Sequence, residues 1–465
     1  MSAPVFWIVL PVLVGALALF IRNQRILTFV GGSVTILLTL VALLIPIDQA
    51  MQIGQLSFKI NSSIDVLGRR IILSPAHGAL LAILYGLTAM WLIGSDYVRG
   101  ADRLVPLGLI ITALFVASSA VQPFLYAALL IEMAVLISIP MLLGPMQAPG
   151  PGLMRFLIYN TLAMPFILFA GWMLSGVESS PGDLALAAQS AIILGLGFAF
   201  LFAIFPLYTW LPMLAEEANP YLVGFIFWIL PTSTTIFGMG FLDRYSWIRN
   251  SPQLPVILQA AGLLMVVTGG IWSSFQRHLG RQMAYGTVTE IGISLLALSL
   301  GTNRGIQIAF MLIIPRSLAL MTWALALSKL KEIKPSLRYK EIQGLAKIYP
   351  LSSAGLILAH LSTAGLPLLA GFPVRLALWD SLASQSLNLA LWLLIGILGL
   401  MVGAIRSMAV LVMSPEMEDW QFREQWRPGI LIGVGILLLI ILGIFPQSMH
   451  IILKNLPSIF THLIS

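Results

Sequence analysis

Five ionisable side chains lie within long apolar stretches of the sequence, where a charge is costly to bury. They are Glu132 in LYAALLIEMAVLISI, Glu290 in AYGTVTEIGISLL, Arg316 in MLIIPRSLALM, Arg375 in GLPLLAGFPVRLAL and Arg406 in MVGAIRSMAVLVM. An ionised side chain costs at least about 2.5–3.5 kcal/mol at the centre of a bilayer, so it indicates an interhelical ion pair or a path for ions. Charged groups scattered over several helices at middle depth are what a water-linked proton path requires. These five residues are therefore candidates for ion translocation.

The remaining residue types exclude several other kinds of chemistry. The chain has no cysteine, which excludes disulfides, thiolate metal sites and iron–sulfur clusters. Its five histidines have no ligand-like spacing, so we expect no metal site; they are His77, His278, His360, His450 and His462. We therefore expect no cofactor, redox centre or catalytic site in this chain, and any redox chemistry would belong to a partner.

The apolar stretches themselves predict transmembrane helices. Of the 465 residues, 59% are hydrophobic and 9% charged, which excludes a water-soluble globular protein. Each run is about 20 residues long, the length at which a helix crosses a hydrocarbon core of about 30 Å. The sequence thus predicts an all-α membrane protein with about 14 transmembrane helices, at 4–21, 27–46, 71–94, 104–121, 123–143, 154–175, 185–208, 220–241, 254–275, 284–301, 305–328, 351–379, 386–413 and 429–446.

The basic residues predict the orientation of these helices. Most of them fall in alternate loops, and the largest such loop, Lys329 to Tyr349, is basic and polar. By the positive-inside rule these loops lie inside, so both termini lie outside and the number of spans is even. The first apolar run has no basic residue before it and is followed by Arg22 and Arg25, the reverse of a secretory signal. We therefore expect it to remain in the protein as a transmembrane helix. The net charge of +7 needs no nucleic-acid partner, although the 329–349 loop could contact headgroups or a neighbouring subunit.

Two segments outside the spans have patterns of their own. Polar and apolar residues alternate in QLSFKINSSIDVL, within the loop 47–70, which predicts a short hairpin. The C-terminal segment 447–463 places most of its apolar residues on one helical face, which predicts a helix lying in the membrane interface.

Four motifs resemble one family of membrane proteins. PLYTWLPMLAEEANP, residues 206–220, resembles the PLHxWLPxAHxEAP signature of the antiporter-like subunits of respiratory complex I, of Mrp cation/proton antiporters and of membrane-bound hydrogenases. RQMAYGTVTEIG at 281–292 resembles KRxxAYSSxSHxG, and GLPLLAGFPVR at 365–375 resembles GLPxxxGFxxK. Glu132 takes the place of the fifth-helix glutamate of this family, and Glu217 that of the EAP glutamate. The similarity extends over about residues 100–410.

The resemblance implies a fold of 14 helices with two inverted five-helix repeats. The repeats would be 104–241 (helices 4–8) and 254–413 (helices 9–13), preceded by helices 1–3 in 1–103 and followed by the last helix and the interfacial C-terminus in 414–465. Helices 7 and 12 would be broken, as inverted-repeat transporters require at their binding sites. The residues that would break them are Pro206 and Pro212 in the first, and Gly365, Pro367 and Gly371 in the second.

The sequence departs from the family where the family carries its lysines. Leu201 and Ser233 occupy the lysine positions of helices 7 and 8, and Glu290 replaces the histidine of the SHxG motif. Arg316 falls near the basic position of helix 11, and Arg375 replaces the lysine of GFxxK. A guanidinium does not release its proton at ordinary pH, so the arginines would act as fixed charges and the glutamates as carriers.

The resemblance favours an antiporter-like membrane-arm subunit of a complex-I-like, redox-driven ion pump, which takes part in proton or sodium translocation by a modified charge relay. It would be a subunit of an NADH:quinone-oxidoreductase-like translocase in a bacterial-type inner or other energy-coupling membrane, with other membrane subunits and the lipid bilayer as partners. Two alternatives remain open, a divergent non-conducting scaffold subunit and an independent cation/proton secondary transporter. A continuous line of buried polar groups would favour transport, and a dry, leucine-packed core would favour the scaffold.

Overall fold

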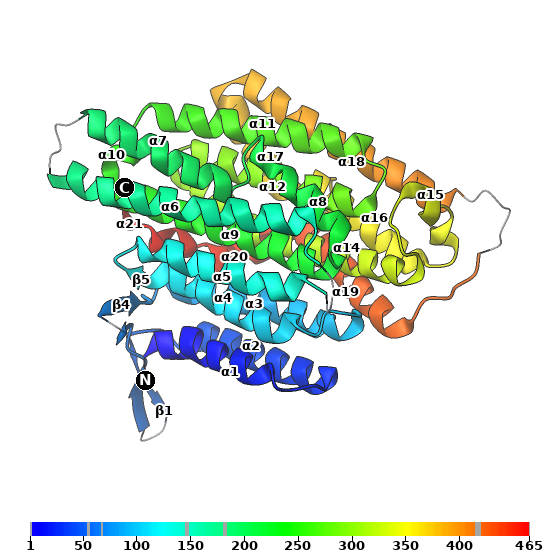
Figure 1. Ribbon diagram of the computed structural model, residues 1–465, viewed down its shortest axis with the longest axis horizontal. Helices are drawn as coiled ribbons and strands as arrows, with labels where there is room; N and C mark the ends of the chain where they lie inside the picture. The colour runs from blue at the N-terminus through cyan, green and yellow to red at the C-terminus, as the bar shows by residue number, and fades with distance from the viewer. Residues whose placement is uncertain are drawn as a thin grey trace.

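The protein is a bundle of long helices that lie side by side, with small β-hairpins at one end (Figure 1). The computed structural model describes residues 2–53, 56–66, 68–144, 148–179, 184–413 and 420–464. Both chain termini lie at the end that carries the hairpins, and the short helix α15 (Tyr339–Ile342) lies at the opposite end (Figure 1). We call this opposite end, with the basic loop 329–349, the α15 end. Among the described residues, eight helices are long and apolar enough to cross a membrane, and four shorter ones are apolar.

The helices follow one another along the whole chain. The N-terminal part contains η1 (Val5–Val9), α1 (Leu10–Ala18), α2 (Gln24–Leu44), α3 (His77–Gly94) and η2 (Ser95–Tyr97). Next come α4 (Leu104–Ala120), α5 (Tyr126–Leu142), α6 (Pro151–Ser179), α7 (Leu184–Leu201), η3 (Leu207–Thr209), α8 (Trp210–Glu217), α9 (Pro220–Arg244) and α10 (Ser246–Arg249). The third group is α11 (Gln253–Phe275), α12 (Leu279–Ser299), α13 (Asn303–Met311), α14 (Ile313–Ile333), η4 (Leu345–Lys347), α16 (Pro350–Ala364), α17 (Phe372–Gln385) and α18 (Leu387–Val412). The chain ends with α19 (Trp426–Ile444), α20 (Gln447–Leu453), η5 (Leu456–Ile459) and α21 (Thr461–Ile464).

Burial separates central from peripheral helices. All of the apolar window of α9 is buried inside the protein, and so is 89% of the window in 303–333, which contains α14. The windows of α2, α11, α18 and α19 are only 28–39% buried, so these helices turn apolar side chains outward. In a membrane such faces meet lipid or another subunit, whereas polar groups on the central helices must be satisfied by the protein itself or by water.

Both predicted helix breaks are present. The chain leaves helical geometry between α7 and η3, around Pro206, and again between α16 and α17, where Gly365 has a φ of +78°. The amide of Gly371 donates to Ser362 Oγ over 3.2 Å, so a hydroxyl satisfies part of the freed backbone. The expectation that Pro212 breaks the helix is wrong. Pro212 lies in the first turn of α8, where a backbone N–H has no intrahelical acceptor and proline is tolerated.

The first large loop forms two hairpins, where the sequence predicted one. Strand β1 (Ala50–Ile53) pairs antiparallel with β2 (Leu56–Lys59), with Ala50 opposite Lys59. Strand β4 (Arg69–Ile72) pairs with β3 (Ser63–Val66) on one side and β5 (Val121–Gln122) on the other. The helix expected from residue 71 therefore begins only at His77, because residues 69–72 belong to the sheet.

The C-terminal segment packs against the protein. The side chain of Leu456 is fully buried, and the ring of Phe460 stacks on that of Phe310 at 6.2 Å. The carboxylate of Asp243 accepts hydrogen bonds from the backbone amides of His462 and Leu463, at 2.7 and 3.1 Å. The sequence assigned this apolar face to the membrane interface. In the structure, part of it packs against the protein itself.

Close contact between α11 and α18 depends on glycine. A methyl group at Gly270 would lie only 2.0 Å from the carbonyl oxygen of Gly396. We therefore expect Gly270→Ala to push the helices apart and to lower the free energy of unfolding by about 1–3 kcal/mol. Gly433→Ala on α19 is the control, since its added methyl group meets nothing within 4 Å. Thermal unfolding in detergent measures both, and equal melting temperatures for the two variants would contradict the packing described.

Candidate functional site

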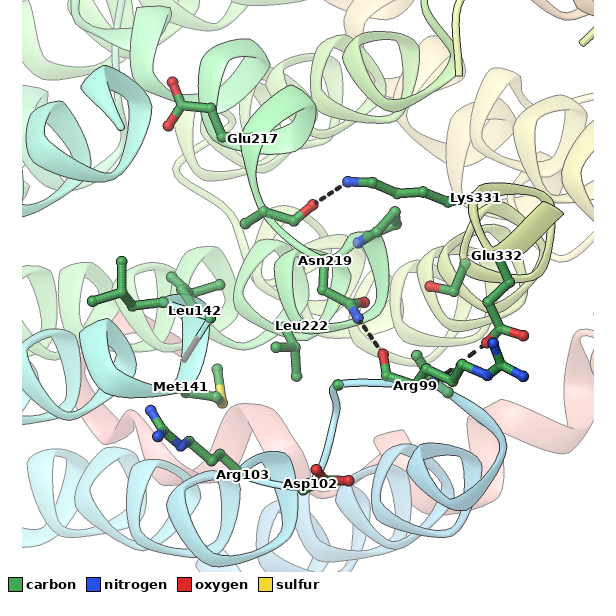
Figure 2. Close-up of a pocket in the computed structure, with 17 residues that line it drawn as sticks. Arg99, Asp102, Arg103, Met141, Leu142, Glu217, Asn219, Leu222, Lys331 and Glu332 are labelled. Atoms are coloured by element: carbon green, nitrogen blue, oxygen red, sulfur yellow. Dashed lines mark hydrogen bonds between the residues drawn. The ribbon is translucent and has the colours of Figure 1, made fainter. Parts of the chain in front are cut away.

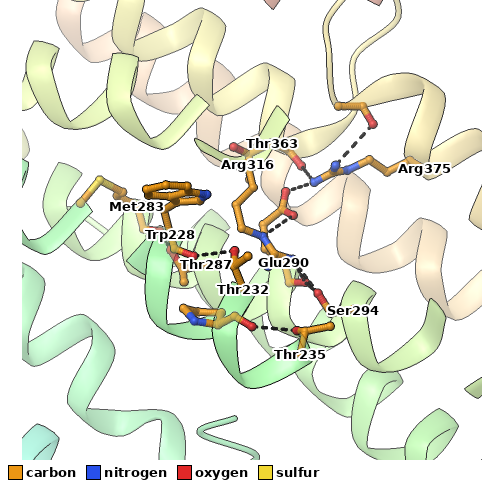
Figure 3. Close-up of polar contacts among 12 residues, drawn as sticks. Trp228, Thr232, Thr235, Met283, Thr287, Glu290, Ser294, Arg316, Thr363 and Arg375 are labelled. Atoms are coloured by element: carbon orange, nitrogen blue, oxygen red, sulfur yellow. Dashed lines mark hydrogen bonds and ion pairs between the residues drawn. The ribbon is translucent and has the colours of Figure 1, made fainter. Parts of the chain in front are cut away.

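Glu290, Arg316 and Arg375 meet in the interior of the protein (Figure 3). They come from α12, α14 and α17, and at most 5% of each side chain is exposed. Arg316 Nε lies 3.3 Å from Glu290 Oε2, and Arg375 Nη2 donates to Glu290 Oε1. The structure thus joins three of the sequence-predicted residues into one buried cluster, which we call the Glu290 cluster.

The two guanidinium groups also donate hydrogen bonds to acceptors other than the carboxylate. Arg316 Nη2 donates to the backbone oxygen of Glu290 at 2.8 Å and to Ser294 Oγ at 2.6 Å. Arg375 Nη2 donates to the carbonyl of Thr363 at 2.7 Å, and its Nη1 to that of Gly371 at 3.3 Å. Each arginine would therefore keep hydrogen bonds if Glu290 became neutral.

The helix break next to the cluster gives Arg375 a hydrogen-bond acceptor and space for its side chain. Because α16 ends at Ala364, the carbonyl of Thr363 is free to accept from the guanidinium. A side chain at Gly365 would lie 2.9 Å from Arg375 Cδ, so glycine leaves the room that the arginine stem occupies. The residues of the GLPLLAGFPVR motif therefore place one long cation beside α12.

The charges in the cluster do not balance. One carboxylate faces two guanidiniums, so the formal net charge of the three side chains is positive. Arginine stays protonated at all ordinary pH values, which leaves Glu290 as the member that can take up and release a proton. Charges buried in this way are stable only while they are paired and hydrogen-bonded.

Glu132 lies apart from this cluster, on the α5–α6 side of the bundle. Thr161 Oγ1 donates to its Oε1 over 2.8 Å, and Oε2 has no partner among the described residues. Apolar side chains on the same helix are exposed beside it, among them Met133 and Leu136. Within the described ranges no ion pair or hydrogen bond joins Glu132 to the Glu290 cluster.

The family lysine positions in α7 and α9 are buried and hold no ionisable side chain. Leu201 and Ser233 are 3% and 4% exposed. Close by, five phenylalanine rings from α7 and its C-terminal end, from α9 and from the segment before α5 pack with centroids 5.1–6.0 Å apart: Phe198, Phe202, Phe237, Phe241 and Phe124. This part of the first predicted repeat therefore offers aromatic packing in place of ionisable groups.

Glu217 stabilises a helix end. Its carboxylate accepts from the amide of Gly152 at 2.8 and 3.0 Å and from that of Leu153 at 3.3 Å, at the start of α6. The side chain also lines a cavity of about 490 Å³ at the α15 end, whose other charged residues are Arg99, Asp102, Arg103, Lys331 and Glu332 (Figure 2). The cavity has both signs of charge, which gives it no clear preference for an anion or a cation.

The neighbouring Glu216 belongs to a surface network. It pairs with Arg281 at 2.5 Å and with Arg338 at 3.4 Å. Burial alone would raise the pKa of its carboxyl group, but Arg281, His278 and Arg338 together hold that pKa below the usual value. Burial lowers the pKa of His278 to about 4, and its Nδ1 accepts from the amide of Arg281 at 3.3 Å.

Arg406 lies on α18 at the α15 end, outside the Glu290 cluster. Its Nη1 donates to the carbonyl of Ser274, and its guanidinium lies 5.9 Å from the ring centre of Tyr339. The sequence placed Arg406 within a span because its neighbours are apolar, and it did not show that a loop from α15 folds back to meet it.

Sequence reasoning missed the polar residues around the cluster. On α12, Gln282, Gly286, Glu290 and Ser294 recur every four residues, so they lie along one helix face. This spacing is visible in the sequence and would have indicated a polar stripe through the interior.

Known proteins are similar to this chain in sequence and in fold. The model of the family described as NADH:quinone oxidoreductase/Mrp antiporter, TM, matches residues 153–403, more than half of the chain. NADH-quinone oxidoreductase subunit N of Pelagibacter ubique is 26% identical over 316 residues, which are 64% of this chain and 65% of that protein. NAD(P)H-quinone oxidoreductase chain 4 3 of Picosynechococcus sp. is 28% identical over 248 residues, 50% of this chain and 44% of that protein. The chain thus spans about half to two thirds of the length of these curated relatives.

Two solved structures have the same fold. A chain of respiratory complex I from Thermus thermophilus with bound NADH superposes with a TM-score of 0.78 at 20% identity, covering 99% of this chain and 100% of that one. A chain of the Mrp complex from Dietzia sp. gives a TM-score of 0.78 at 14% identity, covering 99% and 97%. The resemblance inferred from the four motifs is confirmed, whereas the number of helices, the inverted repeats and the domain boundaries remain predictions.

The Glu290 cluster predicts a stability difference between buried and exposed ion pairs. Glu290→Leu leaves two buried guanidiniums without their carboxylate, and we expect it to lower the free energy of unfolding by about 3–5 kcal/mol. Asp380→Leu is the control, because Asp380 pairs with Arg304 at 2.8 Å with both side chains more than half exposed. Thermal unfolding should show a large loss for the first and a small one for the second. Equal losses would mean that the buried pairs do not stabilise the fold.

The Glu216–His278 network predicts sensitivity to acid. The pKa of His278 is lowered to about 4 in the folded protein, so the unfolded chain binds more protons between that pH and 6.5. Stability therefore falls as the pH falls through this window, and the lowered pKa of Glu216 adds a further loss below the usual carboxyl value of 4.5. His278→Asn, which keeps a hydrogen-bond acceptor at the start of α12, should reduce the loss by about 1–3 kcal/mol. Unfolding measured from pH 7 to pH 4 tests this, and parallel curves for the two proteins would refute it.

Proposed function

Because the chain belongs to the NADH:quinone oxidoreductase/Mrp antiporter transmembrane family, we propose that it is an antiporter-like subunit that moves protons across the membrane as part of a larger complex. The observation that carries this proposal is Glu290, buried between Arg316 and Arg375 beside a broken helix. A proton carrier in a membrane needs a group that titrates, a charge to control it, and a break in the helices that admits water. The Glu290 cluster supplies the first two, and the break before α17 supplies the third.

In this mechanism Glu290 carries the proton and the arginines stay charged. In one state the ionised carboxylate pairs with both guanidiniums. When a proton arrives, Glu290 becomes neutral and the pairing weakens. The arginines then remain held by the carbonyls of Thr363 and Gly371 and by Ser294. Each guanidinium therefore keeps hydrogen bonds when Glu290 is neutral, but both lose their carboxylate counter-charge. The neutral state is then costly, which favours release of the proton.

The arrangement favours a proton over a sodium ion. The arginines already occupy both carboxylate oxygens to which a sodium ion would bind. Within the described ranges, no group of three or more His, Cys, Asp or Glu side chains could hold a metal ion. A proton needs no such cage, since it moves along hydrogen bonds.

A non-conducting scaffold is the second candidate, and one observation favours it. Leu201 and Ser233, with five phenylalanine rings near them, leave the first predicted repeat without the two lysines of its family. We propose that this half of the protein is structural and that transport uses the other half. An independent transporter is less well supported, because exposed apolar side chains beside Glu132, among them Met133 and Leu136, offer an outer side that a neighbouring membrane subunit would cover.

Proton flux tests the proposal. The complex containing this chain is purified, reconstituted into liposomes and driven by its own reaction while the internal pH is followed. Glu290→Gln should lower the flux at least about tenfold, because the amide keeps a hydrogen-bond acceptor for the arginines but cannot carry a proton. Asp380→Asn, which alters an exposed ion pair, should leave the flux unchanged. Full flux through an assembled Glu290→Gln complex would favour the scaffold.

A further inference from the structure

A second buried polar cluster lies between the Glu290 cluster and the α15 end. Gln282 Nε2 donates to Tyr339 OH at 2.7 Å, and Ser407 Oγ donates to Gln282 Oε1 at 2.6 Å. The hydroxyl groups of Tyr339 and Ser407 lie 3.0 Å apart, which closes a triangle of three side chains. These groups join α12, α18 and the loop that carries α15, and we call them the Gln282 cluster.

A gap separates the two clusters. Gln282 and Glu290 lie two turns apart on one face of α12, which is about 12 Å along the helix. A hydrogen bond spans only about 2.7–3.2 Å, so several links are needed between them. The residue of α12 midway along this face is Gly286, which has no side chain and leaves room for its neighbours.

His360 on α16 lies near the Gln282 cluster and one turn from the Glu290 cluster. Gly403 accepts a hydrogen bond from Gln282, and a methyl group at Gly403 would lie 3.3 Å from His360 Cε1. Thr363, whose carbonyl holds Arg375, follows His360 by one turn of α16. The imidazole ring stacks on Trp323, with centroids 4.3 Å apart, and both side chains are fully buried.

Several buried polar atoms at and beside His360 have no hydrogen-bond partner in the described part of the chain. Neither ring nitrogen of His360 makes a hydrogen bond to any described residue, and the same holds for Ser273 Oγ and Trp323 Nε1. A buried polar group without a hydrogen-bond partner destabilises the folded protein. A methyl group at Gly403 would also lie 2.9 Å from Ser273 Oγ, so His360 and Ser273 approach the same point on α18. Buried polar groups gathered in this way are the usual site of internal water.

We propose that His360 is a proton-transfer residue which, with bound water, links the Gln282 cluster to Glu290. The inference rests on the function proposed above and adds the route by which protons reach the carboxylate from the α15 end. An imidazole suits this role because it can receive a proton at one nitrogen and release one from the other. At each transfer an O–H or N–H bond forms on the acceptor as one breaks on the donor, so protons balance and nothing is oxidised or reduced. Passage through the ring exchanges its two tautomers, and a return proton shift through the bound water restores the first.

The first test distinguishes the contribution of the His360 ring nitrogens to proton flux from that of the ring's shape. His360→Phe keeps the stacking on Trp323 but removes both nitrogens, and we expect it to lower proton flux at least about tenfold while assembly and melting temperature stay near those of the unmodified protein. Gly403→Ala adds a methyl group between His360 and Ser273, and its expected effect is a partial loss. Gly433→Ala, in open space on α19, is the matched control and should keep full flux.

The outcomes distinguish this inference from the proposed function. Loss of flux in His360→Phe supports the route. Normal flux in His360→Phe together with loss in Glu290→Gln overturns the role of His360 and leaves the proposed function standing. Normal flux in both overturns the proposed function as well.

A second measurement tests the role of His360 if the His360→Phe complex fails to assemble. A cryo-EM map of the unmodified complex, sharp enough to show ordered water, should contain water within hydrogen-bond distance of the His360 nitrogens and of Ser273 Oγ. A ring surrounded only by hydrocarbon would overturn the inference.

Discussion

The pairing of one buried carboxylate with two guanidiniums is the constraint on which the rest of the structure depends. Leaving either charge type unpaired in the interior would cost several kcal/mol, so three helices must hold Glu290, Arg316 and Arg375 in register. The break between α16 and α17 serves this requirement, since it frees the Thr363 carbonyl and opens space at Gly365 for the arginine stem. The nearly complete burial of α14 follows as well, because a charged residue near its start must be kept from lipid.

The two halves of the protein differ in the polar groups that they bury. In the half that contains α11–α18, buried polar side chains form two hydrogen-bonded clusters, one around Tyr339 and Gln282 and one around Glu290 and Ser294. His360 is the proposed link between them. In the half that contains α4–α9, the corresponding family positions hold Leu201 and Ser233, and phenylalanine rings fill the space near them. A helix bundle loses no stability by replacing buried ions with well-packed apolar groups, so this exchange preserves the fold while removing a possible route for ions.

The sequence predicted the membrane class, the order of the helices and both helix breaks, because runs of about 20 apolar residues and Gly-Pro clusters act locally. It predicted that the acids and arginines were important but not which of them meet, since pairing joins segments such as 290 and 375 that are distant along the chain. It misjudged Pro212, because a proline breaks a helix only beyond its first turn. The sequence did not indicate a role for His360, because a lone histidine in an apolar run has no local pattern. Its ring nitrogens are seen to lack partners among the described residues only once α16 packs against α14 and α18.

The central claim is that Glu290 changes its protonation state during turnover while the two arginines do not. Infrared difference spectroscopy of the complex, between its resting and driven states, reports this directly through the C=O stretch of a protonated carboxylic acid. We predict a carboxylic-acid band that appears on driving the complex and is missing from the Glu290→Gln variant. A band that persists unchanged in Glu290→Gln, or no carboxylic-acid band in the unmodified complex, would contradict the account.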